Sequence, residues 1–250
     1  MNVDHLTAPV TREDNRLARA QRFIARRSRS KRAQFFVHLL SPHTAASILD
    51  LGGGRGRHFP THLPELRNVC IADHNPAALA FARQRFGFET VLLDATERLP
   101  FSDKEFDIVF CSSVIEHVTG PKDLAVDLFK RDGYAFRTIS SEHQKRFAAE
   151  IRRIGKRYFV QTPNRYFPVE VHSWLPMLGY LPTHLQWAVM SITNRFWPRR
   201  DQRPDWSLLT YKEVQDLFPD AEIYREQFLG FTKSIIAVSR TWPGLDTYSS

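Results

Sequence analysis

The sequence predicts an α/β fold built on a doubly wound, mostly parallel sheet. Three observations predict it. Short apolar runs alternate with segments of helical periodicity between residues 47 and 163. A glycine-rich loop follows the first apolar run, and an acidic residue stands at or just past the end of each of the first three runs. In a parallel sheet such residues gather at one edge, which is where ligands of this fold class bind.

The composition suits one domain, or one domain with a cap, because 250 residues with 42% apolar side chains can bury a sizeable core. No stretch reaches about 18 uninterrupted apolar residues, and the N-terminus lacks the apolar centre of a signal peptide. We therefore expect a cytoplasmic protein without a transmembrane span. Cys70 and Cys111 lie in apolar, strand-like runs, which indicates reduced core residues, and we expect no metal site.

Residues 1–40 form a basic segment in front of a main domain at 41–240, which a tail at 241–250 follows. Apolar and basic residues alternate with helical spacing from Thr11 to Leu40, which predicts one or two helices. The chain carries a net charge of +8, and the excess is concentrated here, in Arg16, Arg19, Arg22, Arg26, Arg27, Arg29, Lys31 and Arg32. The simplest interpretation is a solvated helix face, and the alternative is a basic lid over an anionic substrate or a membrane surface.

The central stretch of the main domain is SILDLGGGRGR at 47–57. A short apolar run and Asp50 lead into a set of closely spaced glycines, Gly52, Gly53, Gly54 and Gly56. Glycines allow positive φ and let a ligand lie against bare backbone, and the helix that follows presents unpaired N–H groups. Because the last glycine stands at 56 rather than 57, the loop lacks the G-x-G-x-x-G spacing of dinucleotide-binding proteins.

Two further carboxylates follow the next two predicted strands. The second strand, at 68–73, ends in Asp73, about 20 residues past the glycine loop, where an acid can accept hydrogen bonds from both hydroxyls of a ribose. The third strand, at 90–93, is followed by Asp94. A lone Asp after a strand is usually a helix cap. Three at successive strand ends, beside a glycine loop, indicate a nucleoside ligand.

Together these residues resemble the class I S-adenosylmethionine (SAM)-dependent methyltransferases, in the small-molecule branch that is similar to methyltransferase type 11. The string D-x-G-x-G-x-G at 50–56 resembles motif I of that family, and Asp73 matches its motif II. The stretch LPFSDKEFDIVFCSSVIEHV at 99–118, which includes a predicted fourth strand, resembles its motifs III and IV. The resemblance is strong over 47–118 and moderate over 141–240. It implies a Rossmann-like sheet of seven strands.

The resemblance also implies SAM as the cofactor and S-adenosylhomocysteine as the product. In that family the glycine loop wraps the methionine end of SAM, the motif II acid binds the ribose, and the acid after the third strand binds the adenine together with the next backbone N–H. His74 would stack on the adenine or be an exposed loop residue. The implied cofactor-binding residues are Asp50, Gly52, Gly53, Gly54, Gly56, Asp73, His74, Asp94, Ala95, Cys111 and Ser112.

Residues 119–140 fit the resemblance less well, and we interpret them as an insertion in the form of a mobile flap. Helical spacing resumes at Ser141, where Ser141 and Gln144 predict a capping box. A fifth strand is expected at 157–162, where Pro163 stops it.

Residues 173–208 are rich in aromatic residues and proline and show no strand pattern. We interpret them as a helical cap over the substrate pocket, and the alternatives are a helical excursion that packs on the sheet and an interfacial membrane patch. Thr210 and Glu213 predict a capping box for the next helix. Two strands, at 221–228 and 232–240, match the antiparallel hairpin that closes the sheet in the family.

The expected reaction is methyl transfer from SAM to an oxygen of a small molecule, with nitrogen and carbon less favoured. A hydroxyl must lose its proton, and histidine suits that step near neutral pH. The candidates are His117, after the fourth strand, and His172, at the mouth of the cap, although relatives that work by proximity need neither. The basic N-terminus and the aromatic cap favour an anionic acceptor, or one linked to a lipid or glycan, with peripheral membrane contact. The sequence leaves the oligomeric state open.

Two alternatives stay open. The positive charge is compatible with an RNA methyltransferase, but residues 111–114 read CSSV, where amino-methylating enzymes carry N/D-P-P-Y. The chain also lacks the Pro-Cys pair of the enzymes that methylate cytosine at C5, so nucleic acid is the less favoured partner. The other alternative is a SAM-binding protein that does no chemistry.

Overall fold

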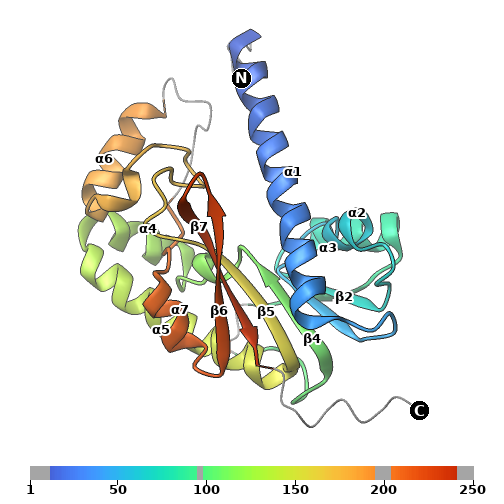
Figure 1. The fold of residues 1–250 in the computed structure, drawn as a ribbon. Helices are drawn as coiled ribbons and strands as arrows, with labels where there is room; N and C mark the ends of the chain where they lie inside the picture. Colours follow the sequence, from blue (N-terminus) through green and yellow to red (C-terminus); the bar gives the residue numbers. More distant parts are fainter. Residues whose placement is uncertain (1–11, 95–97, 195–203, 241–250) are drawn as a thin grey trace, which may run out of the picture.

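The structure, a computed structural model, describes residues 12–94, 98–194 and 204–240, with only the backbone described for 12–25. Seven strands form one sheet (Figure 1) in the order β3-β2-β1-β4-β5-β7-β6. The strands are β1 Ile48–Leu51, β2 Val69–Asp73, β3 Glu89–Leu92, β4 Phe106–Ser112, β5 Gly155–Pro163, β6 Ala221–Phe228 and β7 Phe231–Ser239. The first five are parallel, and β7 runs antiparallel to both β5 and β6. The predicted mostly parallel sheet of seven strands is confirmed.

The strand order reverses between β1 and β4, which pair directly with each other. The chain moves outward from β1 to β3 and then returns to the other side of β1. At such a reversal the connections leave on opposite faces, so a crevice opens at the carboxyl ends of the two central strands. Leu51 at the end of β1 is the register partner of Cys111 in β4, so the glycine loop and the segment after β4 leave the sheet side by side.

Helices cover both faces of the sheet, and alternate strand residues supply two separate cores. Ile48 faces one core, which α1 (Arg12–Leu40), α2 (His58–His62) and α3 (Pro76–Phe86) cover through residues such as Phe36 and Phe59. Leu49 faces the other core, which α5 (Gly133–Ile154) and α7 (Tyr211–Leu217) cover. Figure 1 shows these two groups of helices on opposite sides of the sheet.

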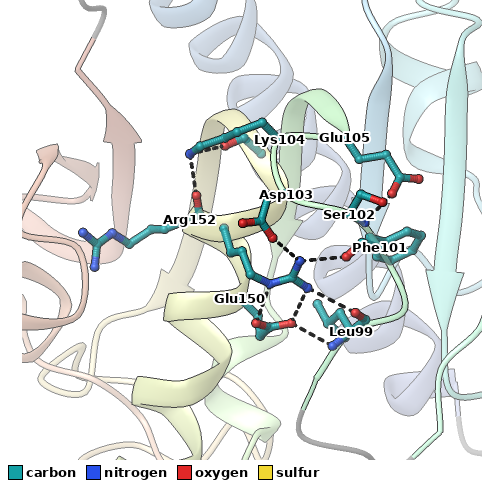
Figure 2. Close-up of polar contacts among 10 residues, drawn as sticks. Leu99, Phe101, Ser102, Asp103, Lys104, Glu105, Glu150 and Arg152 are labelled. Carbon is teal, nitrogen blue, oxygen red and sulfur yellow. Dashed lines mark hydrogen bonds and ion pairs between the residues drawn. The ribbon is translucent and has the colours of Figure 1, made fainter.

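Residues 99–103, which carry the L-P-F-x-D pattern, lead into the start of β4 at the end of the sheet away from the crevice. Contacts with α5 hold them in place (Figure 2). Arg153 of α5 donates to the carbonyls of Phe101 and Leu99, at 2.7 and 3.2 Å, and pairs with Asp103 at 2.8 Å. The Glu150 carboxylate accepts from the Leu99 N–H at 2.8 Å and pairs with the same guanidinium. This part of the motif therefore has a structural role.

The expected restart of the helix at Ser141 is wrong. Residues 122–131 form α4 (Lys122–Arg131), and α5 already begins at Gly133. Asp132 caps α5 by accepting from the Ala135 N–H at 2.9 Å, so Ser141 lies inside the helix. Gln144 is buried, and its amide donates to the carbonyls of Ile115 and Ser207 at 3.1 and 2.9 Å. Residues 119–140 are therefore largely helical rather than a flap.

The described part of the expected cap contains a 3-10 turn, Leu178–Tyr180, and α6 (Thr183–Thr193). It packs against α4 and the first turns of α5 through a third apolar cluster of Ala125, Phe129, Phe136, Leu175, Leu178, Met190, Trp206 and Leu208. The segments at 119–140 and 173–194 thus form one helical layer at one end of the sheet (Figure 1). Residues 195–203 of the expected cap lie outside the described residues.

The capping box at Thr210 and Glu213 is confirmed, with both reciprocal hydrogen bonds present. The basic segment is one helix over the range that the structure describes. None of the described helices is long and apolar enough to span a bilayer.

Candidate active site

The glycine loop at the end of β1 has a backbone in the left-handed region that favours glycine, and close contacts exclude a side chain from part of it. Gly52, Gly54 and Gly56 have φ values of +76°, +54° and +62°. A Cβ on Gly52 would lie 2.4 Å from a methyl group of Val114, and a Cβ on Gly53 would lie 2.5 Å from Oδ2 of Asp50. The loop therefore passes against the segment after β4 and over the Asp50 carboxylate with no room for side chains.

Two carboxylates lie close together beside this loop. Asp50 is buried, and its Oδ2 has no hydrogen-bond partner among the described residues. Burial, together with the nearby charge of Asp73, raises the pKa of Asp50 to about 7. The Asp73 carboxylate ends β2 and accepts from the N–H groups of Gly54 and Asn75, both at 2.9 Å. Such a pair, with one buried oxygen unsatisfied, suits a ligand that carries positive charge and hydrogen-bond donors.

We expect Asp50→Asn to raise the free energy of unfolding of the cofactor-free protein above about pH 7, on the order of 2–4 kcal/mol. The folded pKa of Asp50, about 7, lies above the unfolded value of about 3.9. The folded chain therefore binds the extra proton, and stability falls as the pH rises from about 4 to about 7. Urea unfolding across this range checks the prediction. The two proteins should agree in acid and diverge toward neutral pH, and a constant difference would contradict it.

The other predicted cofactor residues occupy different positions along the same edge. Asp94 is exposed and lies two residues past the end of β3. His74 is 85% exposed, with Nδ1 3.5 Å from Oδ1 of Asp73. Cys111 is buried in the core. Ala95 lies outside the described residues. The edge thus brings together the glycine loop, Asp50 and Asp73.

Ser112 ends β4 in a buried polar chain that sequence reasoning missed. Its hydroxyl donates to Oε1 of Gln161 at 2.8 Å and accepts from Nη1 of Arg32 at 3.1 Å. The Arg32 side chain is only 13% exposed, and its Nε lies 3.7 Å from Oε2 of the buried Glu226. Burial lowers the pKa of Arg32. The expectation of a solvated basic face is therefore wrong for Arg32, whereas Arg26, Arg27, Arg29 and Lys31 are exposed.

A second polar cluster begins directly after β4, in the 3-10 turn Ile115–His117. Glu116 is completely buried, with Oε2 3.1 Å from the hydroxyl of Thr162 and Oε1 without a hydrogen-bond partner within the described ranges. Nδ1 of His117 lies 3.3 Å from Oδ1 of Asp205, and Lys122 pairs with the other oxygen of Asp205 at 3.0 Å. Burial raises the pKa of Glu116. Burial alone would lower the pKa of His117, but Asp205 and Glu116 outweigh it and raise that pKa.

His172 completes this cluster from the segment after β5. Its Nδ1 lies 2.7 Å from Oε1 of the buried Glu170, whose other oxygen accepts from the N–H and hydroxyl of Ser173, both at 2.6 Å. The imidazole stacks on Trp206, and its centroid is 4.9 Å from that of His117, with the two rings nearly perpendicular. Burial alone would raise the pKa of Glu170, but the hydrogen bonds from His172 and Ser173 lower it. The structure therefore brings the two predicted histidines together.

The chain shares its fold with known methyltransferases. Residues 49–131, from β1 to the end of α4, match the family model described as a methyltransferase domain. One chain of a complex between the Trm112 methyltransferase activator of Haloferax volcanii and a candidate methyltransferase is 15% identical, with a TM-score of 0.51, and the match covers 92% of this chain and 96% of that one. A candidate O-methyltransferase from Nostoc punctiforme is 11% identical, with a TM-score of 0.51, over 85% of this chain and 56% of that one.

A SAM-dependent methyltransferase from Aquifex aeolicus is 13% identical, with a TM-score of 0.43, over 77% of this chain and 80% of that one. No curated protein sequence matches the chain. The two structures with a TM-score of 0.51 support the fold, and the matched methyltransferase domain spans the glycine loop, Asp50 and Asp73.

Proposed function

We propose that the methyl acceptor of this SAM-dependent methyltransferase, whose residues 49–131 match a methyltransferase domain, is a hydroxyl oxygen of a small molecule. The observation that carries the proposal is the pair of imidazoles, His117 and His172, at the carboxyl ends of β4 and β5, each held by a carboxylate. A hydroxyl must give up its proton as it reacts. A carboxylate–histidine pair is a common means of accepting it.

The cofactor is S-adenosylmethionine, which when bound supplies an electrophilic methyl carbon on a sulfonium sulfur that leaves as the thioether S-adenosylhomocysteine. The chain's own part is to hold it with the residues implied by the resemblance. The unsatisfied oxygen of Asp50 and the glycine loop suit the positively charged methionine end, and Asp73 is assigned to the ribose. His74, Asp94, Ala95, Cys111 and Ser112 complete the proposed binding set.

In this proposal His117 accepts the acceptor's proton. Its Nδ1 faces Asp205, so Nε2 is the nitrogen placed to take the proton, and the nearby carboxylates stabilise the resulting imidazolium. His172, perpendicular to it and stacked on Trp206, is the alternative proton acceptor. The indole of Trp206 covers one face of the His172 ring.

We expect His117→Ala to lower kcat about 100-fold or more, with the Kd for SAM unchanged. S-adenosylhomocysteine release from labelled SAM, with small-molecule fractions of a cell extract as acceptors, measures turnover, and calorimetry measures SAM binding. The matched control is His184→Ala, an exposed histidine on α6. Full turnover in both His117→Ala and His172→Ala would reject the histidine pair as catalytic. Release of labelled product only with nitrogen acceptors would reject the hydroxyl.

The class of acceptor is proposed from the surroundings of the site. The exposed arginines of α1 and the aromatic side chains of the cap favour an anionic acceptor, or one carried by a lipid or glycan. Both cysteines are free and buried, which fits the cytoplasmic location that we propose. RNA is the second candidate because of the same arginines. A salt-dependent gel shift with RNA fragments would support it.

A further inference from the structure

Three side chains from the ends of two parallel strands converge beside the proposed acceptor position. Glu116 and His117 follow β4, and His172 follows β5. One carboxylate oxygen and one ring nitrogen from each histidine all lie within 4.8 Å of one another. Ligands of one metal ion, at bond lengths of about 2.0–2.2 Å, lie at most about 4.4 Å apart. A small inward movement of the side chains would therefore bring all three into range of one ion.

Each histidine is oriented by a carboxylate that faces its Nδ1. Asp205 lies 3.3 Å from Nδ1 of His117, and Glu170 lies 2.7 Å from Nδ1 of His172. Metal-binding histidines almost always have such a partner on the second ring nitrogen, because it fixes the tautomer and turns the other nitrogen toward the ion. Glu170 is itself fixed by the N–H and hydroxyl of Ser173. The cluster thus contains the three possible metal ligands and also the two carboxylates that would orient the histidines.

The third residue of the cluster, Glu116, has a carboxylate oxygen that lacks a hydrogen-bond partner among the described residues. Glu116 is completely buried, and its Oε1 has no hydrogen-bond partner in the part of the chain that the structure describes. Within the described residues, three carboxylates, those of Glu116, Glu170 and Asp205, lie beside the two histidines together with the ammonium of Lys122. A divalent cation would compensate negative charge in such a carboxylate-rich cluster.

We infer that Glu116, His117 and His172 bind a divalent transition-metal ion. Two imidazoles and one carboxylate suit Mn²⁺, Fe²⁺, Co²⁺ or Zn²⁺ better than Mg²⁺ or Ca²⁺, which prefer oxygen ligands alone. The inference deepens the proposed function and rests on its hydroxyl acceptor. With an ion bound, Nε2 of His117 would be a ligand rather than the proton acceptor, and the cation would bind the acceptor oxygen and lower the pKa of its hydroxyl, whose proton would pass to solvent. It also departs from the expectation of no metal site, because Glu116 and His117 lie on one segment and His172 on another, and the fold brings them together.

Titration of the metal-stripped, untagged full-length protein with Co²⁺ tests the inference, because the visible absorption of Co²⁺ reports its ligands. We expect one ion per chain with a spectrum of mixed nitrogen and oxygen coordination. Glu116→Gln and His172→Ala should each weaken binding about 100-fold or more, and Glu170→Gln about 10- to 100-fold. His184→Ala is the matched control and should bind as the parent protein does. Calorimetry with SAM shows in parallel that each variant is folded.

Absence of Co²⁺ binding in the parent protein, or binding that survives both Glu116→Gln and His172→Ala, overturns the inference. Measuring turnover after treatment with a chelator shows whether only the metal site is wrong or whether the proposed hydroxyl acceptor is wrong as well. Chelator-resistant turnover that still requires His117 would reject the cation and keep the histidine as the proton acceptor. Site-specific Co²⁺ binding, with no transfer to any hydroxyl acceptor, would keep the cation and reject the proposed acceptor.

Discussion

Asp73→Ala is expected to abolish measurable SAM binding while the chain stays folded. Asp73 ends β2 beside the glycine loop, where its carboxylate is held by the N–H groups of Gly54 and Asn75. As proposed, it accepts hydrogen bonds from both ribose hydroxyls. A hydrogen bond to a charged group contributes about 1.5–3 kcal/mol, so losing two weakens binding by a factor of about 10² to 10⁴. Isothermal calorimetry with SAM measures the loss.

Two variants make this result interpretable. Asp73→Asn keeps the shape and one acceptor oxygen, so we expect a smaller loss of affinity than in Asp73→Ala. Asp216→Ala removes a carboxylate that is 62% exposed on α7, and its affinity for SAM should equal that of the parent protein. A thermal transition in each variant shows that the loop region has not unfolded. Unchanged affinity in a folded Asp73→Ala protein would remove Asp73 from the ribose site.

The parts of the fold and site that sequence reasoning predicted are set by local patterns. Each strand of the parallel sheet is a short apolar run, and Gly52, Gly54 and Gly56 allow the positive φ values that the loop adopts. Asp50 and Asp73 lie on neighbouring parallel strands, so their approach follows from strand order. These features need no knowledge of distant contacts.

The features that were missed depend on contacts between residues far apart in the chain. Arg32 sits in a run of basic residues that otherwise face solvent, and only the packing of α1 against the sheet buries it. Asp205, 88 residues further along the chain, lies 3.3 Å from His117. The start of α5 was misplaced because Ser141 and Gln144 have the spacing of a capping box, whereas Asp132 supplies the cap. A local motif could not show which of two polar residues a helix would use.

The second large effect that we predict is a loss of stability on substitution of Arg32, which connects α1 to the end of β4. Its guanidinium lies between the hydroxyl of Ser112 and the carboxylate of Glu226, and both Arg32 and Glu226 are largely buried. Removing Arg32 leaves the buried Glu226 carboxylate without its ion-pair partner, although Lys233 also interacts with it, and breaking a buried ion pair costs about 3–5 kcal/mol. We therefore expect Arg32→Met, which keeps the length of the side chain, to destabilise the protein by about 3 kcal/mol. Urea unfolding measures the change.

The double variant Arg32→Met/Glu226→Gln decides whether charge is the cause. It leaves no isolated carboxylate, so we expect it to recover most of the stability that Arg32→Met loses. Arg27→Met, on the exposed side of the same helix, should change stability by less than about 0.5 kcal/mol. If the double variant is as unstable as the sum of the single variants, packing rather than charge fixes α1. Calorimetry with SAM on the same proteins then shows whether the Arg32–Ser112 contact also supports cofactor binding, since its loss leaves Ser112 with its hydrogen bond to Gln161.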